Sequence, residues 1–280
     1  MRRSLVKQGT ALLVAMVGLG ATAVSAADAP PVFSSTPQAA WVGIGIGAFF
    51  PVPGSPTPIG QDPAHRYISN DEATATGQQP NQRISDAGHP NLKQWAKDGM
   101  TKDNAEVLAG KFAFTARSSC QPGGVPGFDV LLGGALSILQ LPSEVTMIFS
   151  GNAETRHIRL NASHPANPTP SWYGDSVGHY EGDTLVVDTI GLNDKTFIDN
   201  YRTPHTAKLH VTERWRMIEG GKKLEILLTL DDPDTFNQPW QALRQYDRVN
   251  RNFSEDVCSE NNFNPFGIDY MTPVADKPDF

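Results

Sequence analysis

The feature that most constrains this fold is a regular series of strand signals in the second half of the chain. Short runs rich in branched and aromatic residues begin near Ser137 and continue at 145–150, 155–160, 176–181, 184–190, 208–218, 223–231 and 240–249. Glu181-Gly182-Asp183 and Gly220-Gly221 are turn sequences that connect antiparallel neighbours. Seven or eight such strands predict a mainly β fold, either an antiparallel up-and-down (lipocalin-like) barrel or a sandwich.

The first third of the chain carries weaker signals. Residues 27–90 contain ten prolines and no sustained periodicity, which predicts an irregular arm. Its apolar, glycine-rich run at 41–50 is expected to pack on the core or plug one end of it. Residues 92–111 predict a helical segment, interrupted near Gly99 and stopped at Gly110. We therefore expect one β-rich domain with a helical start over 91–262, followed by a tail over 263–280.

The N-terminus has the organisation of an export signal. Arg2, Arg3 and Lys7 precede an apolar run over 10–24, and Val24-Ser25-Ala26 is a small-residue cleavage site. The arginine pair also fits a twin-arginine signal, and ordinary Sec export stays open beside it. Both routes place the mature chain, without residues 1–26, in the periplasm or outside the cell, with no membrane span.

The charge balance excludes two classes of partner. The chain has 23 basic and 30 acidic residues, a net charge of −7. Removing the signal takes away three basic residues and no acidic one, which leaves 20 against 30 and a net charge of −10. Nucleic acids and anionic membrane surfaces are therefore poor partners, and a small-molecule ligand or substrate is expected. The sequence carries no signal for an oligomeric state.

Cys120 and Cys258 are the two cysteines of the chain. In an oxidising compartment a lone pair predicts one disulfide. It would close a loop of 139 residues and contribute about 4–5 kcal/mol by the chain-entropy argument. The alternative is a reactive or metal-binding thiol, although no Cys-x-x-Cys pattern is present.

Glu213 breaks the alternation of its strand. It lies on the face that it shares with Leu209, Val211, Trp215 and Met217. A buried carboxylate requires a partner, an accessible cavity or a raised pKa. Glu213 is therefore a candidate general acid or base, and the alternative is an internal ion pair, for example with Arg244 or Arg248.

Two further residues depart from their surroundings. His205 lies in the loop over 191–206, which is too long for a minimal hairpin and suits a proton-transfer group; the alternative is a surface histidine. Asp188 is the one charged residue in the apolar run over 185–190. It is predicted to be either a pocket carboxylate or the ion-pair partner of Arg214. Glu213, His205 and Asp188 form our predicted catalytic set.

The remaining candidates concern metal and substrate. His179 and Glu181 share one strand face and are weak candidates for a metal site with a third histidine, although an exposed turn explains them equally well. No cofactor is expected. The predicted substrate-binding residues are Arg214, Tyr201, Trp172 and Trp215; the two tryptophans are alternatively ordinary core or rim aromatics.

Several motifs carry a resemblance to a known family. They lie at 116–126, 156–160, 170–174, 176–189 (Ser-Val-Gly-His-Tyr-Glu-Gly-Asp-Thr-Leu-Val-Val-Asp-Thr), 204–205, 213–214, 231–233 and 258–261. With them, the chain resembles a widespread family of exported bacterial proteins of unknown function from about residue 88 to residue 262. The resemblance implies export and a single β-rich domain, and it assigns no catalytic residue.

Three functional hypotheses follow. The first is a periplasmic enzyme with an acid/base site inside a barrel cavity, a non-redox lyase, isomerase or hydrolase of a small, partly apolar molecule. The second is a non-catalytic lipocalin-like protein that binds a lipid-like or aromatic ligand. The third is an interaction role through the proline-rich arm. Convergence of Glu213, Asp188 and His205 in one open cavity would favour the enzyme. A cavity lined only by apolar side chains, with Glu213 closed off against an arginine, would favour the binding protein. The absence of any cavity would favour the interaction role.

Overall fold

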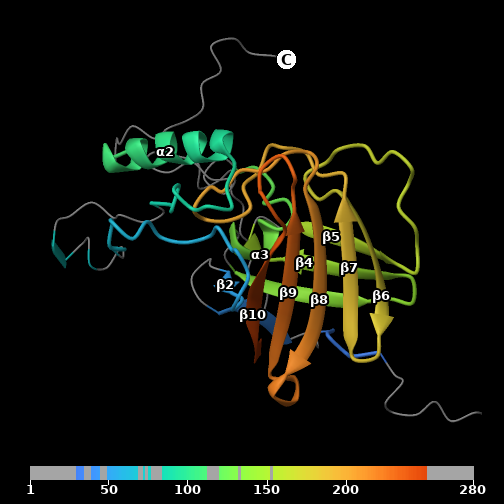
Figure 1. The fold of residues 1–280 in the computed structure, drawn as a ribbon. Coiled ribbons are helices and arrows are strands. Elements are labelled where there is room, and N and C mark those ends of the chain that lie inside the picture. Colours follow the sequence, from blue (N-terminus) through green and yellow to red (C-terminus); the bar gives the residue numbers. More distant parts are fainter. Residues whose placement is uncertain are drawn as a thin grey trace, which may run out of the picture.

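The strands of this chain close into a β-barrel (Figure 1). The computed structural model describes residues 30–34, 39–44, 49–68, 72, 75–76, 84–111, 120–131, 134–151 and 154–250. Within these residues nine strands form the closed barrel, and a short tenth strand adds to its rim. The mainly β barrel prediction is confirmed, and closure decides against the sandwich.

The order of the barrel strands largely follows the sequence. They are β1 (Ala39–Gly43), β3 (Ala135–Gln140), β4 (Glu144–Phe149), β5 (Thr155–Leu160), β6 (Asp175–Glu181), β7 (Thr184–Ile190), β8 (His210–Ile218), β9 (Lys223–Asp231) and β10 (Trp240–Asn250). Neighbouring strands are antiparallel except β5 and β6, which pair in parallel at two positions. The loop over 161–174 returns the chain to the end from which β5 started, so the sheet is mixed rather than purely up-and-down.

Strand β1 closes the barrel from within the segment expected to be an irregular arm. It pairs with β3 on one side and with β10 on the other. Trp41 is fully buried, and its indole N–H donates to the Phe33 carbonyl at 3.0 Å. The short strand β2 (Phe50–Pro51) also pairs with β10. The barrel therefore includes residues before the expected boundary at 90; β1 is too short to show a period in the sequence, and its hydrogen bonds come from strands far along the chain.

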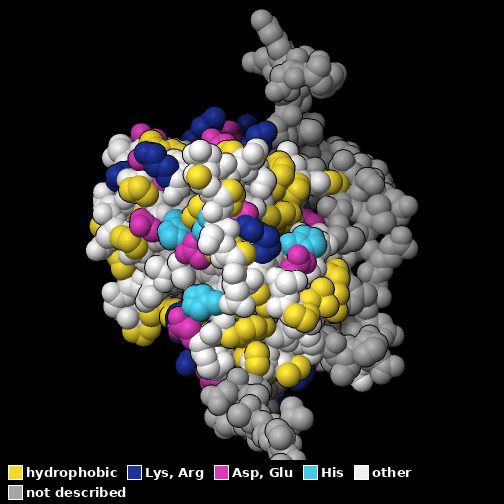
Figure 2. Space-filling view, turned by 90° about the vertical axis from the view of Figure 1, so that its right-hand side faces the viewer, with side chains coloured by type: hydrophobic (Ala, Val, Ile, Leu, Met, Phe, Trp, Pro, Cys, Tyr) yellow, Lys and Arg dark blue, Asp and Glu magenta, His cyan; other side chains and the backbone are white. Residues whose placement is uncertain are grey.

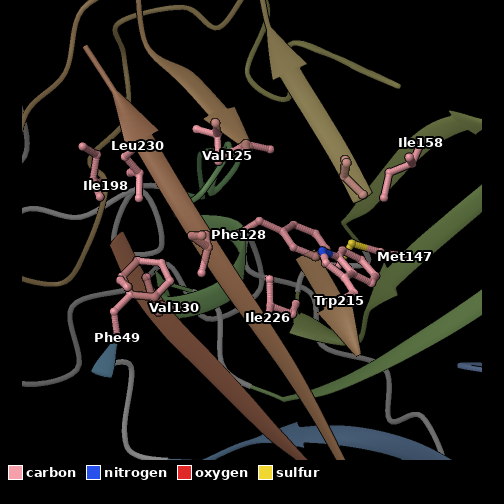
Figure 3. Packing of buried hydrophobic residues seen from close by; sticks show 14 of the residues in the cluster. Phe49, Val125, Phe128, Val130, Met147, Ile158, Ile198, Trp215, Ile226 and Leu230 are labelled. Carbon is pink, nitrogen blue, oxygen red and sulfur yellow. The ribbon is translucent and has the colours of Figure 1, made fainter. Parts of the chain in front are cut away.

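The interior of the barrel is packed with large apolar side chains. Figure 3 shows Phe128, Met147, Trp215 and Ile226 converging in the middle of the cluster. Phe128 enters from the short helix α3 (Phe128–Leu131) and meets Phe149 edge-on at 5.2 Å between ring centroids. Each such side chain contributes about 1.5–3 kcal/mol on burial, so the interior is the main source of stability.

Helix α2 (Gln94–Leu108) lies beside the barrel (Figure 1). It runs through Gly99 without the expected interruption, since an isolated glycine inside a helix costs only about 1 kcal/mol. It ends before Gly110, whose positive φ of 85° suits glycine. No helix in the described part of the chain is long and apolar enough to cross a membrane.

Several predictions fall outside the described residues. The export signal over 1–26, Cys258 and the tail over 263–280 all lie there. The disulfide between Cys120 and Cys258 therefore stays a prediction, as do export and the compartment.

Candidate functional site

Glu213 points into the barrel and is closed off by an arginine. Arg156 on β5 faces it, with Nη1 donating to Oε1 at 3.1 Å and Nη2 to Oε2. Both side chains are fully buried. Nη2 also donates to Thr189 Oγ1 at 3.1 Å and contacts Ser176 Oγ at 3.4 Å. One guanidinium thus spans the inner surface of β5, β6, β7 and β8.

The expected partners of Glu213 lie elsewhere. Arg244 donates through Nη1 to the Ile44 carbonyl at 2.7 Å and fills the space over Gly43, where a Cβ would lie 1.7 Å from Nη2. Arg248 lies over the ring of Trp41, 4.6 Å from its centroid. The expected pairing was wrong because it relied on β10, the strand that follows the β8–β9 hairpin in sequence, whereas the ion pair forms with Arg156 on β5 across the curved inner wall.

Asp188 lies on the outer wall of the barrel. Its neighbour Val187 pairs with Glu213 and faces inward, so Asp188 faces outward. Oδ1 contacts His164 Nε2 at 2.8 Å, and Oδ2 contacts His210 Nε2 at 2.6 Å. Burial alone would raise the pKa of Asp188, but the bonds from the two histidines outweigh it and hold that pKa below its ordinary value.

The contacts of Asp188 continue into a longer chain. His164 Nδ1 contacts Asp175 Oδ1 at 2.6 Å. Arg159 Nη2 donates to both oxygens of Asp175 at 2.8 Å. We call the series Arg159, Asp175, His164, Asp188 and His210 the outer-wall chain. Its central side chain, His164, is 19% exposed, and its terminal side chain, His210, is 44% exposed.

The contacts of the outer-wall chain constrain where its protons lie. An ionised carboxylate only accepts hydrogen bonds, so a ring nitrogen beside one must carry a proton. His164 meets carboxylates with both ring nitrogens, which requires one proton more than a neutral imidazole holds.

Histidines and carboxylates also meet elsewhere on this face. Figure 2 shows histidine side chains beside acidic ones on the side that carries β6 and β7. His179 Nε2 contacts Glu181 Oε1 at 3.1 Å, and Arg214 occupies the other oxygen of Glu181 at 2.8 Å. Arg214 thus pairs with Glu181 rather than with Asp188. Among the described residues no group of three or more His, Cys, Asp and Glu side chains is arranged to hold a metal ion.

His205 is a buried loop histidine. Nε2 shares a hydrogen bond with Thr196 Oγ1 at 2.9 Å, and Nδ1 contacts the Thr206 carbonyl at 3.1 Å. Burial lowers the pKa of His205 and favours its neutral form. The structure therefore does not bring Glu213, Asp188 and His205 together: the first lies inside the barrel, the second on its outer wall and the third inside a loop.

The predicted substrate-binding residues also lie in different parts of the structure. Trp215 is fully buried in the core, edge-on to Phe33 at 6.2 Å, which matches the core alternative. Trp172 and Tyr201 are half-buried in loops. Burial raises the pKa of Tyr201.

The sequence interpretation missed Arg156, although a signal for it was present. In strand β5, Arg156 alternates with Ile158 and Leu160, which are inward-facing. The alternation that singled out Glu213 would therefore have singled out its partner. His164 had no such signal, because it lies in an irregular loop.

The sequence matches no protein-family model, and a search of curated proteins finds no match. The resemblance to exported bacterial proteins stays a prediction.

Proposed function

We propose that the protein is an exported acid/base enzyme, a non-redox lyase, isomerase or hydrolase of a small, partly apolar molecule, and that the outer-wall chain transfers its proton. The observation that carries this proposal is that Asp188 binds the Nε2 atoms of two histidines, one of which is half-exposed. Histidine is the side chain whose charge most readily changes near neutral pH.

Each member of the outer-wall chain takes a distinct role. His210 is the group that exchanges a proton with the substrate. Asp188 orients the His210 ring, as a carboxylate does in a catalytic dyad. His164 holds the additional proton one hydrogen-bonded step away. Asp175 and Arg159 fix the His164 ring from its other side. Glu213 has no part in this scheme, because it is fully buried against Arg156.

Mass spectrometry of small molecules tests the proposal. The exported protein and the variants His210→Asn and Asp188→Asn are purified, and each is incubated with a small-molecule extract of the producing cells. His179→Asn is the matched control, because His179 is also a half-exposed histidine bonded to a carboxylate on this wall. The wild type and the control should convert the same compound, and His210→Asn should lose about 100-fold or more of the rate. Equal conversion by His210→Asn would refute the assignment.

The second candidate is a non-catalytic binding protein for a lipid-like or aromatic ligand. The observation that favours it is the closure of Glu213 by Arg156, which leaves the inner wall without a free acid or base at that position. The same mass spectra separate the two candidates. A compound that co-purifies unchanged with the wild type and with every variant supports binding and counts against catalysis.

A further inference from the structure

The loop between β5 and β6 is a strap that is fixed firmly only at its two ends. At one end the Asn161 N–H donates to the Gly178 carbonyl at 2.7 Å. At the other end the Ser171 N–H donates to the Gly191 carbonyl at 3.0 Å. Among the described residues, no backbone–backbone hydrogen bond involves residues 162–170, and three prolines in this stretch have no N–H to donate. We call residues 161–171 the strap.

One side chain ties the middle of the strap to the barrel. His164 Nδ1 contacts Asp175 Oδ1 at 2.6 Å, and Nε2 contacts Asp188 Oδ1 at 2.8 Å. Asp175 begins β6 and Asp188 lies on β7, so one ring holds the strap to two strands. Between its ends the strap makes one other polar contact within the described part of the chain. Arg159 Nη2 approaches the Ser163 carbonyl at 3.4 Å, which is long for a hydrogen bond.

The charged groups around His164 make this tie depend on one proton. Asp175 and Asp188 face the ring directly, and Arg159 of β5 and His210 of β8 lie on their far sides. The bonds to Asp188 hold its pKa below the ordinary value, so this carboxylate accepts at neutral pH. His210 contacts it through Nε2 alone, for which a neutral ring is sufficient. Arginine keeps its charge throughout. The additional proton is therefore required by the two contacts of His164.

Closure of the strap and binding of this proton are thermodynamically linked. The closed strap holds the additional proton, whereas an exposed imidazole loses its proton near about pH 6.5. Above that pH the closed state binds more protons than the open state, so a rise in pH favours opening, by up to about tenfold per pH unit.

We propose that His164 is a pH-sensitive latch, which holds the strap over Asp188 in mildly acidic and neutral solution and releases it in alkaline solution. The latch itself does not depend on the proposed function. Only its consequence, that the strap controls access to Asp188, rests on that function.

Methyl-carbon relaxation NMR of alanine measures the latch. Ala162 and Ala166 flank His164 in the strap, and methyl groups do not exchange with water as amides do at alkaline pH. Both precede Pro168, which packs on Gly191 so closely that a Cβ there would lie 2.8 Å from the proline Cβ. In the wild type the order parameters of both methyl axes should be about 0.85 at about pH 6 and below about 0.6 at about pH 9.

Three variants separate the latch from a general effect of pH. Asp188→Asn introduces a side chain that can donate or accept, so a neutral His164 is sufficient and the strap should stay ordered at both pH values. His164→Leu removes both contacts, and the strap should be mobile at both. His179→Asn is the matched control and should behave as the wild type. Ala242, fully buried in β10, should keep its order in every protein and thereby report an intact barrel.

Three results would overturn the proposal. They are strap methyl groups of the wild type whose order is the same at both pH values, mobility that rises on acidification instead, and a pH response of Asp188→Asn that equals that of the wild type. Since no substrate enters the measurement, its failure is distinct from a failure of the proposed function.

Discussion

At the scale of single residues, three carboxylates of the described part of this chain lie in three different environments. Glu213 is neutralised by Arg156 inside the barrel, and Asp188 is bound by two histidines on the outer wall. Asp199 is enclosed by backbone and hydroxyl donors in a loop. The surroundings of each carboxylate therefore determine its behaviour, and each environment gives a different experimental signature.

The Arg156–Glu213 pair should show strong non-additivity. Glu213→Leu or Arg156→Met leaves one uncompensated buried charge, which should lower the free energy of unfolding by about 3–5 kcal/mol. The double variant removes both charges, so it should be destabilised less than the sum of the single variants, and less than either of them. Urea unfolding measures all three proteins. Additive losses would show that the two side chains do not form a pair.

Asp199 should make folding stability depend on pH. Burial raises its pKa from 3.8 to about 6. Its contribution is therefore fully present below about pH 3.8 and lost as pH rises through about 6. Asp199→Asn keeps the acceptor and mimics the protonated acid. Relative to the wild type, it should gain about 1–3 kcal/mol of unfolding free energy between pH 4 and pH 7. Urea unfolding at both values checks this, and a pH-independent difference would contradict it.

The alternation of residues in strands was sufficient to predict the inward position of Glu213 but not the position of Asp188. Asp188 was assigned to an apolar row, and the row faces outward. The loop over 161–174 covers that row, with His164 on Asp188 and Ser171 bridged to Leu192. A covered outer row looks like an inner row in sequence. The residues of this loop follow no strand or helix periodicity, so the sequence gives no sign that His164 contacts Asp188. The outer-wall chain therefore could not be predicted.

At the scale of elements, β1 is the barrel strand that the sequence analysis did not predict. It lies among prolines and glycines, and its partners β3 and β10 are about one hundred and two hundred residues away. The remaining barrel strands match the strand signals closely, because each forms a short-range connection with alternating burial. Local pattern therefore predicted the strands of the sheet, whereas the closing strand depends on long-range pairing.

Trp41 should anchor this closing strand. Trp41→Ala removes a fully buried indole and its hydrogen bond to Phe33, and the free energy of unfolding should fall by about 3–5 kcal/mol. Amide hydrogen exchange should accelerate most along β1 and the paired part of β10. Leu139→Ala on β3 is the control, because Leu139 is largely exposed and its loss should matter little. Unchanged exchange in β1 would show that Trp41 does not hold the strand.

At the scale of the whole molecule, the barrel separates its apolar core from a chain of histidine–carboxylate contacts. Its interior holds the core and the Arg156–Glu213 pair, and its outer wall carries the outer-wall chain. We propose that Asp188, His164 and His210 form one coupled unit on that wall. In a coupled unit, a change at Asp188 alters the protonation of the His164 and His210 rings. Nitrogen NMR observes ring protonation directly.

The most direct test is therefore ¹⁵N NMR of the histidine rings at neutral pH, in the wild type and in Asp188→Asn. We predict that both ring nitrogens of His164 carry protons in the wild type. We also predict that Asp188→Asn shifts the ring signals of His164 and His210 and leaves those of His179 unchanged. An unprotonated nitrogen on His164, together with signals that do not respond to Asp188→Asn, would contradict the account.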